Sequence, residues 1–484
     1  MEHAHLAPSM PGAPPRTAAR SASFLRGNYL SAIENVAQSI GTMGPVATIG
    51  TVLPLLIYKS GNGTWLLFLG VMAAFCLISS SLGVFASRIA SAGSLSAYAE
   101  HGLGKWAGTL TGWSYVVAMT FVVTSSGISC AYYLAIVLSH ATGHALGAPG
   151  LVALTALVVL LAWWPAHRDV RLSTKMMLGA ESFSILVIVV ILVAGMVGTH
   201  HWVDRPQLRL EGAGFGGFRL GFVLAFMTLA GFESASALGE EARDATRTLP
   251  RVMLLCILPT GVLFVGSIYC LTMFSHSLNL ALDQTDAPLD MIARSIGLPA
   301  LGWVSSLGVA ISCYGCAVGG LNAGSRVVYS MARSRQLWGY FEAIHPANGT
   351  PHRALALFAA VAVAVPCAMI GMGVTMADAM DCLMQIASFG FLGGYLVVCI
   401  AAPVHLASRG ELRIGRLAVA VVTTAVIGAA FLLSAMPAPN GPWRYLLYVF
   451  GALLVLGMGV SGRLQGAPPP EPASADAVSD AQLP

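Results

Sequence analysis

Two short segments of a strongly apolar chain combine glycine with residues that interrupt a helix or place a charge in it. Residues 39–45 end in Gly44 and Pro45, and residues 228–234 join a glycine to Glu233. Proline lacks the amide proton that a helix needs and clashes with the preceding turn, so unwound backbone is predicted at the first segment and, by analogy, at the second. Exposed N–H groups after a break bind a carboxylate, and exposed carbonyls before it bind an ammonium group. The chemistry indicated is reversible binding of a small charged or zwitterionic molecule.

Packing is the alternative interpretation of these residues. Glycine and proline are more frequent in membrane helices than in soluble ones. In membrane helices they allow close contacts and kinks. That explanation suffices for the glycines within residues 299–330 and 380–406, and for the pair Cys313 and Cys316. For the two segments above we favour binding, because the breaks fall at corresponding positions of the first and sixth apolar runs.

Two carboxylates at membrane depth are the candidates for proton transfer. Charged groups there are costly, so Glu181 and Glu233 are functional candidates by default. A buried carboxyl group can take up and release a proton as its site opens and closes. Glu233 ranks first because it lies beside the second break, whereas Glu181 could instead pair with a neighbouring helix. Glu34 follows Ser31 at the spacing of a helix capping box.

The elements that would position these groups are membrane-spanning helices. The chain has 484 residues, of which 56% are hydrophobic and only 10% are charged. In a typical water-soluble protein roughly a quarter of the residues are charged. This composition predicts an all-α polytopic membrane protein and disfavours a soluble multidomain enzyme. Runs long enough to cross about 30 Å of hydrocarbon recur twelve times, at 29–58, 64–87, 108–138, 149–165, 176–198, 217–238, 251–274, 299–330, 354–373, 380–406, 415–436 and 443–462.

The positive charges predict the orientation. If both termini are inside, most of the 25 Lys and Arg residues lie on the cytoplasmic side, which the positive-inside rule requires. We therefore expect a multi-pass protein of the cytoplasmic membrane with both termini cytoplasmic. The basic residues left outside are Lys59, Arg205, Arg209, Arg219, Arg294 and Arg444.

The chain divides into one transmembrane domain and two polar tails. We expect a cytoplasmic tail over residues 1–27, a transporter domain over 28–463 and a disordered cytoplasmic tail over 464–484, which is rich in Pro, Ala and acidic residues. Outside the membrane, residues 275–299 predict an amphipathic helix capped by Asp286. Its apolar face could form a lid over the extracellular mouth or pack as an ordinary loop helix.

Three further motifs carry a family resemblance. Residues 92–98 with Gly112 and Trp113, residues 231–250 and residues 321–333 follow one another in a recognisable order. The chain resembles the amino acid–polyamine–organocation superfamily. The resemblance implies the leucine-transporter fold, with inverted repeats of five helices at about 28–198 and 217–406 and two extra helices at about 415–462.

The resemblance also implies where a substrate binds. Phe226 or Met227 occupies the position at which many relatives place a gating aromatic residue. The implied substrate contacts are Ile40, Gly41, Thr42, Met43, Gly44, Pro45, Val46, Phe226, Met227, Thr228, Leu229 and Gly231.

The coupling ion stays open at the level of sequence. Some proton-coupled relatives carry a lysine in the fifth helix, whereas here Ser184 lies near that position. Proton coupling through Glu233, sodium coupling through carbonyls and hydroxyls, and uncoupled exchange are all compatible with the residues. No other cofactor is expected.

These observations predict a permease that moves amino acids or related amines by alternating access. No pattern typical of an enzyme, a metal site or a nucleic-acid-binding surface is present, and the glycines of 212–217 lack the βαβ context of a nucleotide site. The alternatives are a transporter of another small organic solute, such as a nucleobase, osmolyte or organic cation, and a membrane sensor that binds without transporting. The substrate, the direction of transport and the oligomeric state stay undetermined.

Overall fold

The computed structural model describes residues 25–285, 287–435 and 444–466. Within these ranges the regular structure is helical, apart from one isolated bridge between Leu30 and Ala242. The prediction of an all-α fold is confirmed. The helices of the first half are α1 (Ala32–Met43), α2 (Pro45–Thr51), α3 (Leu53–Ser60), η1 (Gly61–Gly63), α4 (Thr64–Ala86), α5 (Leu95–Leu103), α6 (Lys105–Thr142), α7 (Ala148–Arg168), α8 (Val170–Thr199) and α9 (Arg205–Leu208).

The second half repeats the alternation of long helices and short connections. Its helices are α10 (Phe215–Thr228), η2 (Ser234–Leu238), α11 (Ala245–Leu278), η3 (Leu282–Gln284), α12 (Pro288–Ser295), α13 (Pro299–Arg333), η4 (Gly339–Glu342), α14 (His352–Gly371), α15 (Met376–Ser408), α16 (Ile414–Ala435) and α17 (Leu446–Gly466).

Membrane-spanning helices make up most of the described chain. Ten helical stretches are long and apolar enough to cross a membrane. The two remaining predicted spans, 29–58 and 217–238, are the interrupted ones, so the fold has about twelve spans. Large apolar side chains on the outer helices, such as Leu186 on α8 and Val455 on α17, are exposed where lipid would surround the bundle.

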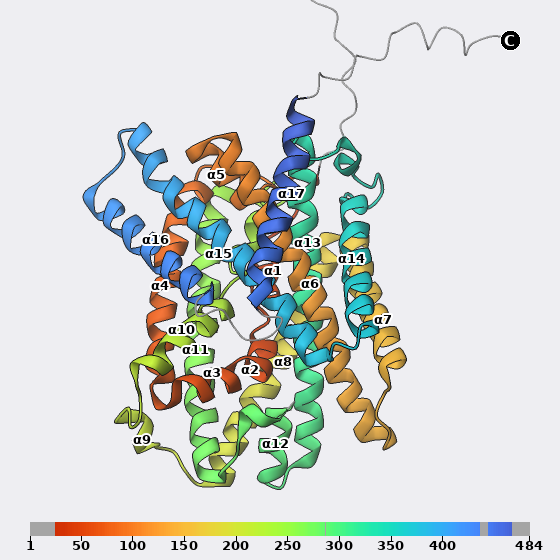
Figure 1. The fold of residues 1–484 in the computed structure, drawn as a ribbon, viewed down its shortest axis with the longest axis vertical. Coiled ribbons are helices and arrows are strands. Elements are labelled where there is room, and N and C mark those ends of the chain that lie inside the picture. The colour runs from red at the N-terminus through yellow and green to blue at the C-terminus, as the bar shows by residue number, and fades with distance from the viewer. Residues whose placement is uncertain (1–24, 286, 436–443, 467–484) are drawn as a thin grey trace, which may run out of the picture.

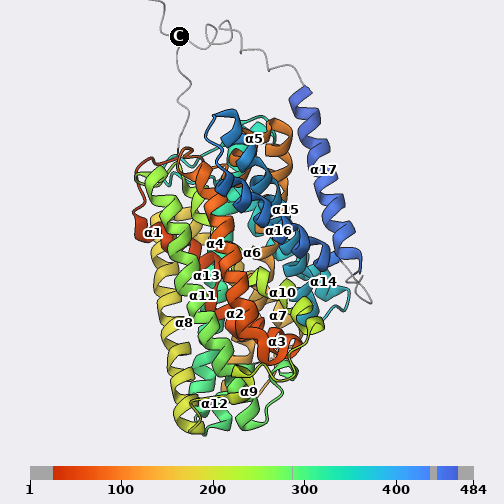
Figure 2. The same cartoon turned by 90° about the vertical axis from the view of Figure 1, so that its left-hand side faces the viewer.

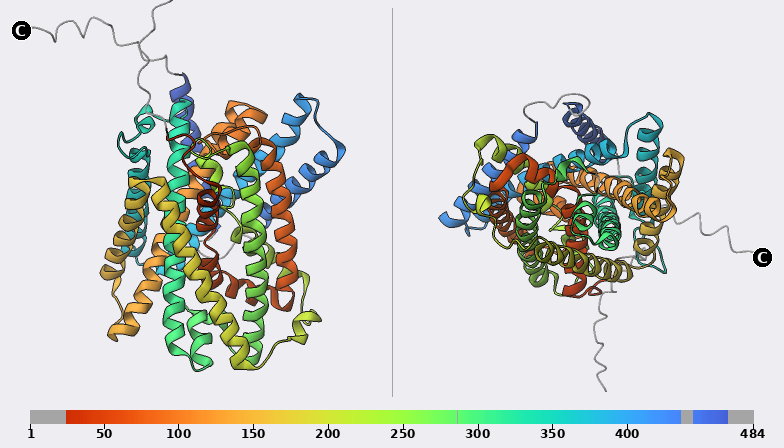
Figure 3. Two further views of the ribbon diagram at one scale, coloured as in Figure 1. Left: turned by 180° about the vertical axis from the view of Figure 1, so that it is seen from behind. Right: turned by 90° about the horizontal axis from the view of Figure 1, so that it is seen from below.

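The helices form one bundle whose centre is built from the longest elements. The 38-residue α6 packs along the 35-residue α13, and Figure 1 shows both in the middle of the bundle. Seen from behind, α1 also lies near the middle (Figure 3). Helices α16 and α17 lie at the periphery, and α17 stands to one side in Figure 2. Helix α1, which leads into the first predicted break, therefore lies among the core helices.

Two helices, α1 and α12, begin close to where local sequence signals predict. Ser31 and Glu34 form the predicted capping box at the start of α1. The predicted external helix is α12, which begins at Pro288 with Ala287 as its N-cap, while the proposed cap Asp286 lies outside the described residues. Its apolar residues Leu289 and Ile292 are fully buried against its neighbours.

The proposed tails lie largely beyond the described chain. Of the predicted tail 1–27 only residues 25–27 are described, and of 464–484 only 464–466. The division into two inverted repeats stays an interpretation of the resemblance.

Candidate functional site

The first break is a single glycine. Helix α1 ends at Met43, Gly44 adopts a left-handed conformation with φ of 55°, and α2 starts at Pro45. Glycine adopts this conformation at little cost, and proline suits the first position of a helix because its missing N–H would have no partner there. The predicted unwinding of residues 39–45 was too extensive, because the helix continues through Met43 and the Gly44 N–H still bonds the Ile40 carbonyl at 3.0 Å.

Close packing explains why the first break needs glycine. A Cβ atom at Gly44 would lie 2.8 Å from the sulfur of Cys316, and one at Gly41 would lie 2.4 Å from a side-chain carbon of Met177. The thiol of Cys316 donates to the Thr42 carbonyl at 2.8 Å. Cys316 is therefore a packing residue, as predicted, and it also covers the carbonyl end of α1.

The second break is longer. Helix α10 ends at Thr228, and residues 229–233 are irregular before η2 begins. Gly231 has φ of 97°, and a Cβ atom there would lie 3.1 Å from the Thr42 side chain. The Gly231 N–H donates to the hydroxyl of Tyr395 at 3.2 Å, which fixes the irregular segment to α15.

The two breaks meet in the bundle. The hydroxyl of Ser234 donates to that of Thr42 at 2.9 Å, and the Ala235 N–H donates to the hydroxyl of Ser39 at 3.2 Å. Segments separated by almost two hundred residues are thus hydrogen-bonded to each other. The structure brings together the two stretches that the sequence singled out.

Glu233 is fully buried beside the second break. The Tyr395 hydroxyl donates to its Oε2 at 2.5 Å, and Tyr115 of α6 is a second phenol close to the carboxyl group. Phe75 and Phe232 pack edge-on to one another, and Phe75 also packs against Tyr395. The carboxyl group therefore lies among aromatic rings with phenol hydroxyls as its polar neighbours.

Glu181 lies beside the first break. Ser312 donates to its Oε1 at 2.8 Å, and the same hydroxyl accepts the Ala47 N–H of α2 at 3.0 Å. Glu181 thus contacts the neighbouring helix α13, which was the alternative considered for it, and reaches the start of α2 through Ser312. Ser184, on the same helix as Glu181, is buried and donates to the Gly308 carbonyl at 2.8 Å.

The amide groups at the start of α2 are partly occupied. Pro45 contributes no N–H, and the Ala47 N–H is bonded to Ser312. Among the described residues, Val46 is the amide in this turn with no side-chain acceptor. Because unpaired N–H groups at a helix start attract anions, this turn is suited to a carboxylate.

A buried polar network supports the first break from the side of α13. Gln38 donates to the Gly319 carbonyl at 2.8 Å and to Thr42 at 3.2 Å, and Asn322 donates to Gln38 at 3.1 Å and to Ser173 at 2.9 Å. Sequence reasoning missed Gln38 and Asn322, as well as Tyr395, Tyr115 and Ser312. Single polar residues inside apolar runs are the only sequence signal that could have found them.

The remaining predicted contacts occupy different surroundings. Phe226 is fully buried and packs on Phe75 with ring centroids 4.7 Å apart. Met227 is partly exposed, and Thr228 and Leu229 are buried at the end of α10. In the first stretch, Ile40 is partly exposed, while Met43 and Val46 belong to the core.

A cavity opens beyond the first break. It has a volume of about 240 Å³ and is lined by Gly50 and Thr51 of α2, by residues of α6 and by Asp283 and Asp381. The end of α2 therefore connects the break to an open space at the end of the bundle that holds η3 and the start of α15.

The opposite end of the bundle is closed by backbone pairing. The N–H groups of Tyr29 and Leu30 donate to the Glu241 carbonyl at 2.7 and 2.8 Å, and the Arg243 N–H donates to the Leu30 carbonyl at 2.8 Å. The segment before α1 is thereby joined to the segment after η2. Each broken helix is held to the other at this end.

Ion pairs reinforce the closure. Arg326 of α13 makes a two-pronged ion pair with Glu241, and both side chains are fully buried. Around it lie the pairs Arg26–Asp169 at 2.9 Å, Arg171–Glu34 at 3.2 Å and Arg333–Glu240 at 3.1 Å. Ion pairs therefore join the segments on both sides of the breaks at the arginine-rich end of the bundle.

Comparison with known proteins shows that the sequence is similar to membrane transporters. Residues 35–438 match the amino acid permease family. An uncharacterized transporter of Mycobacterium tuberculosis is 26% identical over 439 residues, covering 89% of this chain and 90% of the relative. Two proteins of Bacillus subtilis are also similar: a methylthioribose transporter, 24% identical over 71% of this chain and 72% of the relative, and a branched-chain amino acid permease, 23% identical over 74% and 78%.

Proposed function

The chain belongs to the amino acid permease family, and we propose that it is a secondary active transporter of amino acids or related amines. It works by alternating access in the cytoplasmic membrane, with both termini inside. The observation that carries this proposal is the meeting of two broken helices at the centre of the bundle, where Ser234 bonds Thr42. Half-helix ends at mid-membrane depth are suited to ligands that carry charge.

The proposed pose places the substrate carboxylate at the start of α2. There the Val46 N–H and the positive end of the helix attract an anion, and the ammonium group then faces the carbonyls of the second break. Phe226 and Met43 supply an apolar wall for the side chain of the substrate. This pose favours a neutral amino acid with an apolar side chain.

Glu181 is the second candidate for a link between proton and substrate in this scheme. Its carboxyl group reaches the start of α2 through Ser312, so a charged Glu181 competes with a substrate carboxylate for the same positive helix end. Glu233 lies within the irregular backbone of the second break itself. For that reason proton coupling through Glu233 is our first choice, and sodium coupling or exchange are the alternatives that the transport assay separates.

Alternating access requires the arginine-rich end to open. The pairing of Leu30 with Ala242 and the ion pair of Arg326 with Glu241 must separate to release substrate into the cytoplasm. The cavity at Gly50 and Thr51 is then the path from outside. In this scheme the structure corresponds to a state closed toward the cytoplasm.

Uptake into proteoliposomes tests the proposal. The purified protein should accumulate labelled leucine or another neutral amino acid under a pH or sodium gradient, and protein-free liposomes serve as the control. If no amino acid or amine moves or binds under any imposed gradient, the substrate class is wrong.

A second candidate is a transporter of another small organic solute. The similarity to a protein named methylthioribose transporter favours including that compound in the assay. Uptake of methylthioribose without uptake of any amino acid would replace the first proposal. Ligand binding without flux would instead support a non-transporting membrane sensor.

A further inference from the structure

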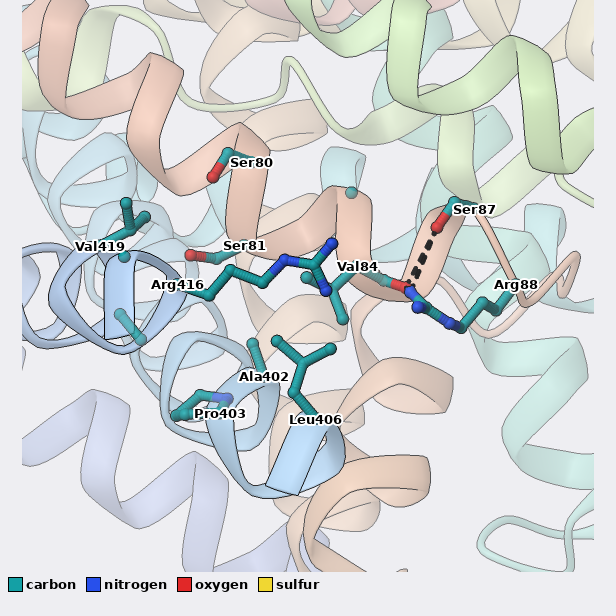
Figure 4. Close-up of a pocket in the computed structure, with 13 residues that line it drawn as sticks. Ser80, Ser81, Val84, Ser87, Arg88, Ala402, Pro403, Leu406, Arg416 and Val419 are labelled. Carbon is teal, nitrogen blue, oxygen red and sulfur yellow. Dashed lines mark hydrogen bonds between the residues drawn. The ribbon is translucent and has the colours of Figure 1, made fainter. Parts of the chain in front are cut away.

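A polar cavity lies away from the two breaks, between α4, α15 and α16. It has a volume of about 370 Å³ and is drawn in Figure 4. Gly83 of α4 and Gly415 of α16 are among its lining residues, and a Cβ atom on Gly415 would meet nothing within 4 Å. The wall of the cavity therefore carries no side chain at these two positions.

Two arginines line this cavity. Arg416 extends from α16 toward α4, so that its guanidinium group lies near Val84 (Figure 4). Arg88, after the end of α4, donates to the Val84 carbonyl and to Glu411, both at 2.6 Å. Glu411 is 4.0 Å from Arg416 and is the acidic residue that both arginines share. One carboxylate facing two guanidinium groups leaves the cavity positively charged.

Hydroxyl groups and a helix start add to the anion-binding character. Ser80, Ser81 and Ser87 line the same cavity, and the exposed Ser80 lies within the apolar span α4. The first turn of α16, through Gly415 and Arg416, forms the opposite wall, where helix N–H groups carry partial positive charge. Guanidinium groups, hydroxyls and helix amides are the donors that phosphate groups bind in proteins.

Apolar side chains also line the cavity. Its remaining wall includes Ala402, Leu406 and Val419. On α16, the side chains of Val421 and Val422 are about half exposed. A ligand that carries a phosphate at one end and a hydrocarbon chain at the other fits both parts.

We propose that this cavity binds the phosphate group of an anionic phospholipid from the cytoplasmic leaflet. The positive charge selects an anionic headgroup, and the position between spans at the arginine-rich end selects a membrane lipid. The bound lipid joins the peripheral helix α16 to α4 of the core. This site does not depend on the identity of the transported substrate.

Lipid binding to the purified full-length protein tests the proposal. Native mass spectrometry and thermal unfolding in detergent are recorded with added dioleoyl phosphatidylglycerol, with dioleoyl phosphatidylcholine and with inorganic phosphate. Phosphatidylglycerol should bind and raise the unfolding temperature more than phosphatidylcholine does. Arg416→Gln should weaken the binding of phosphatidylglycerol about tenfold, because a charge-assisted hydrogen bond is lost.

Two further variants make the result specific. Gly415→Trp should fill the cavity and abolish the preference for phosphatidylglycerol while both arginines remain. Arg413→Gln removes the same charge from an exposed residue just before α16 that is not part of the lining, and it should bind like the wild type. Equal binding of the two lipids, equal loss in Arg413→Gln, or an equal shift with inorganic phosphate alone would each overturn the proposal.

Discussion

At the residue scale, the functional hypothesis depends on a few side chains that share the centre of the bundle. Glu233 accepts a hydrogen bond from Tyr395, and Glu181 accepts one from Ser312. Each carboxyl group lies beside one of the two breaks. Substitutions that keep the shape of the residue can therefore separate the role of each carboxyl group from its packing.

The two glutamates should differ in their effect on proton coupling. We expect Glu233→Gln to reduce the pH dependence of transport more than Glu181→Gln, because Glu233 lies in the irregular backbone next to Gly231 and can move with it. Initial uptake rates measured over a range of external pH check this. Equal or reversed effects would remove Glu233 from the coupling role.

Gly44 should tolerate no side chain. Gly44→Ala places a Cβ atom 2.8 Å from the Cys316 sulfur and adds the cost of a left-handed residue, about 1 kcal/mol. We expect at least a tenfold loss of uptake at normal expression. Gly143→Ala is the matched control, because Gly143 is also left-handed, with φ of 73°, but has nothing within 4 Å of the added atom. Equal loss in both variants would show that backbone conformation alone matters.

At the element scale, the segments before α1 and after η2 act together as one closure. The buried pair of Arg326 and Glu241 connects α13 to this closure. Removing one member of a buried pair leaves the other charge without compensation, which costs about 3–5 kcal/mol.

This cost predicts the behaviour of two related variants. Glu241→Gln should lower the thermal unfolding temperature in detergent and increase labelling of a cysteine introduced at Leu30. Glu240→Gln is the control, since its pair with Arg333 is partly exposed and such pairs contribute about 0–1 kcal/mol. Similar effects of the two substitutions would contradict a special role for the buried pair.

At the scale of the whole molecule, the distribution of basic residues predicts the orientation. Both termini should be cytoplasmic, and α12 should lie outside. Cysteines introduced at Ser295 and at Arg413 in a cysteine-free background should react in intact cells with an impermeant reagent at Ser295 but not at Arg413. If only the Arg413→Cys variant were labelled, the topology would be the reverse of the predicted one.

The class of the molecule could be predicted from its amino-acid sequence. Too few charged residues for a soluble surface, twelve apolar runs and two segments that combine glycine with proline or glutamate predict a polytopic helical protein with breaks at its first and sixth spans. These properties are local. The hydrophobicity of a run depends only on the residues in that run, and the conformational freedom of Gly44 depends only on its missing Cβ atom.

Which groups contact each other depends on the packing of the helices and could not be predicted from the sequence. The extent of the first break depends on Cys316 and Met177 from other helices, and the surroundings of Glu233 depend on Tyr395 and Tyr115. The cavity at Arg416 likewise arises where α16 faces α4. Contacts between residues far apart in the chain depend on how the helices pack, and a single polar residue inside an apolar run does not indicate its partner.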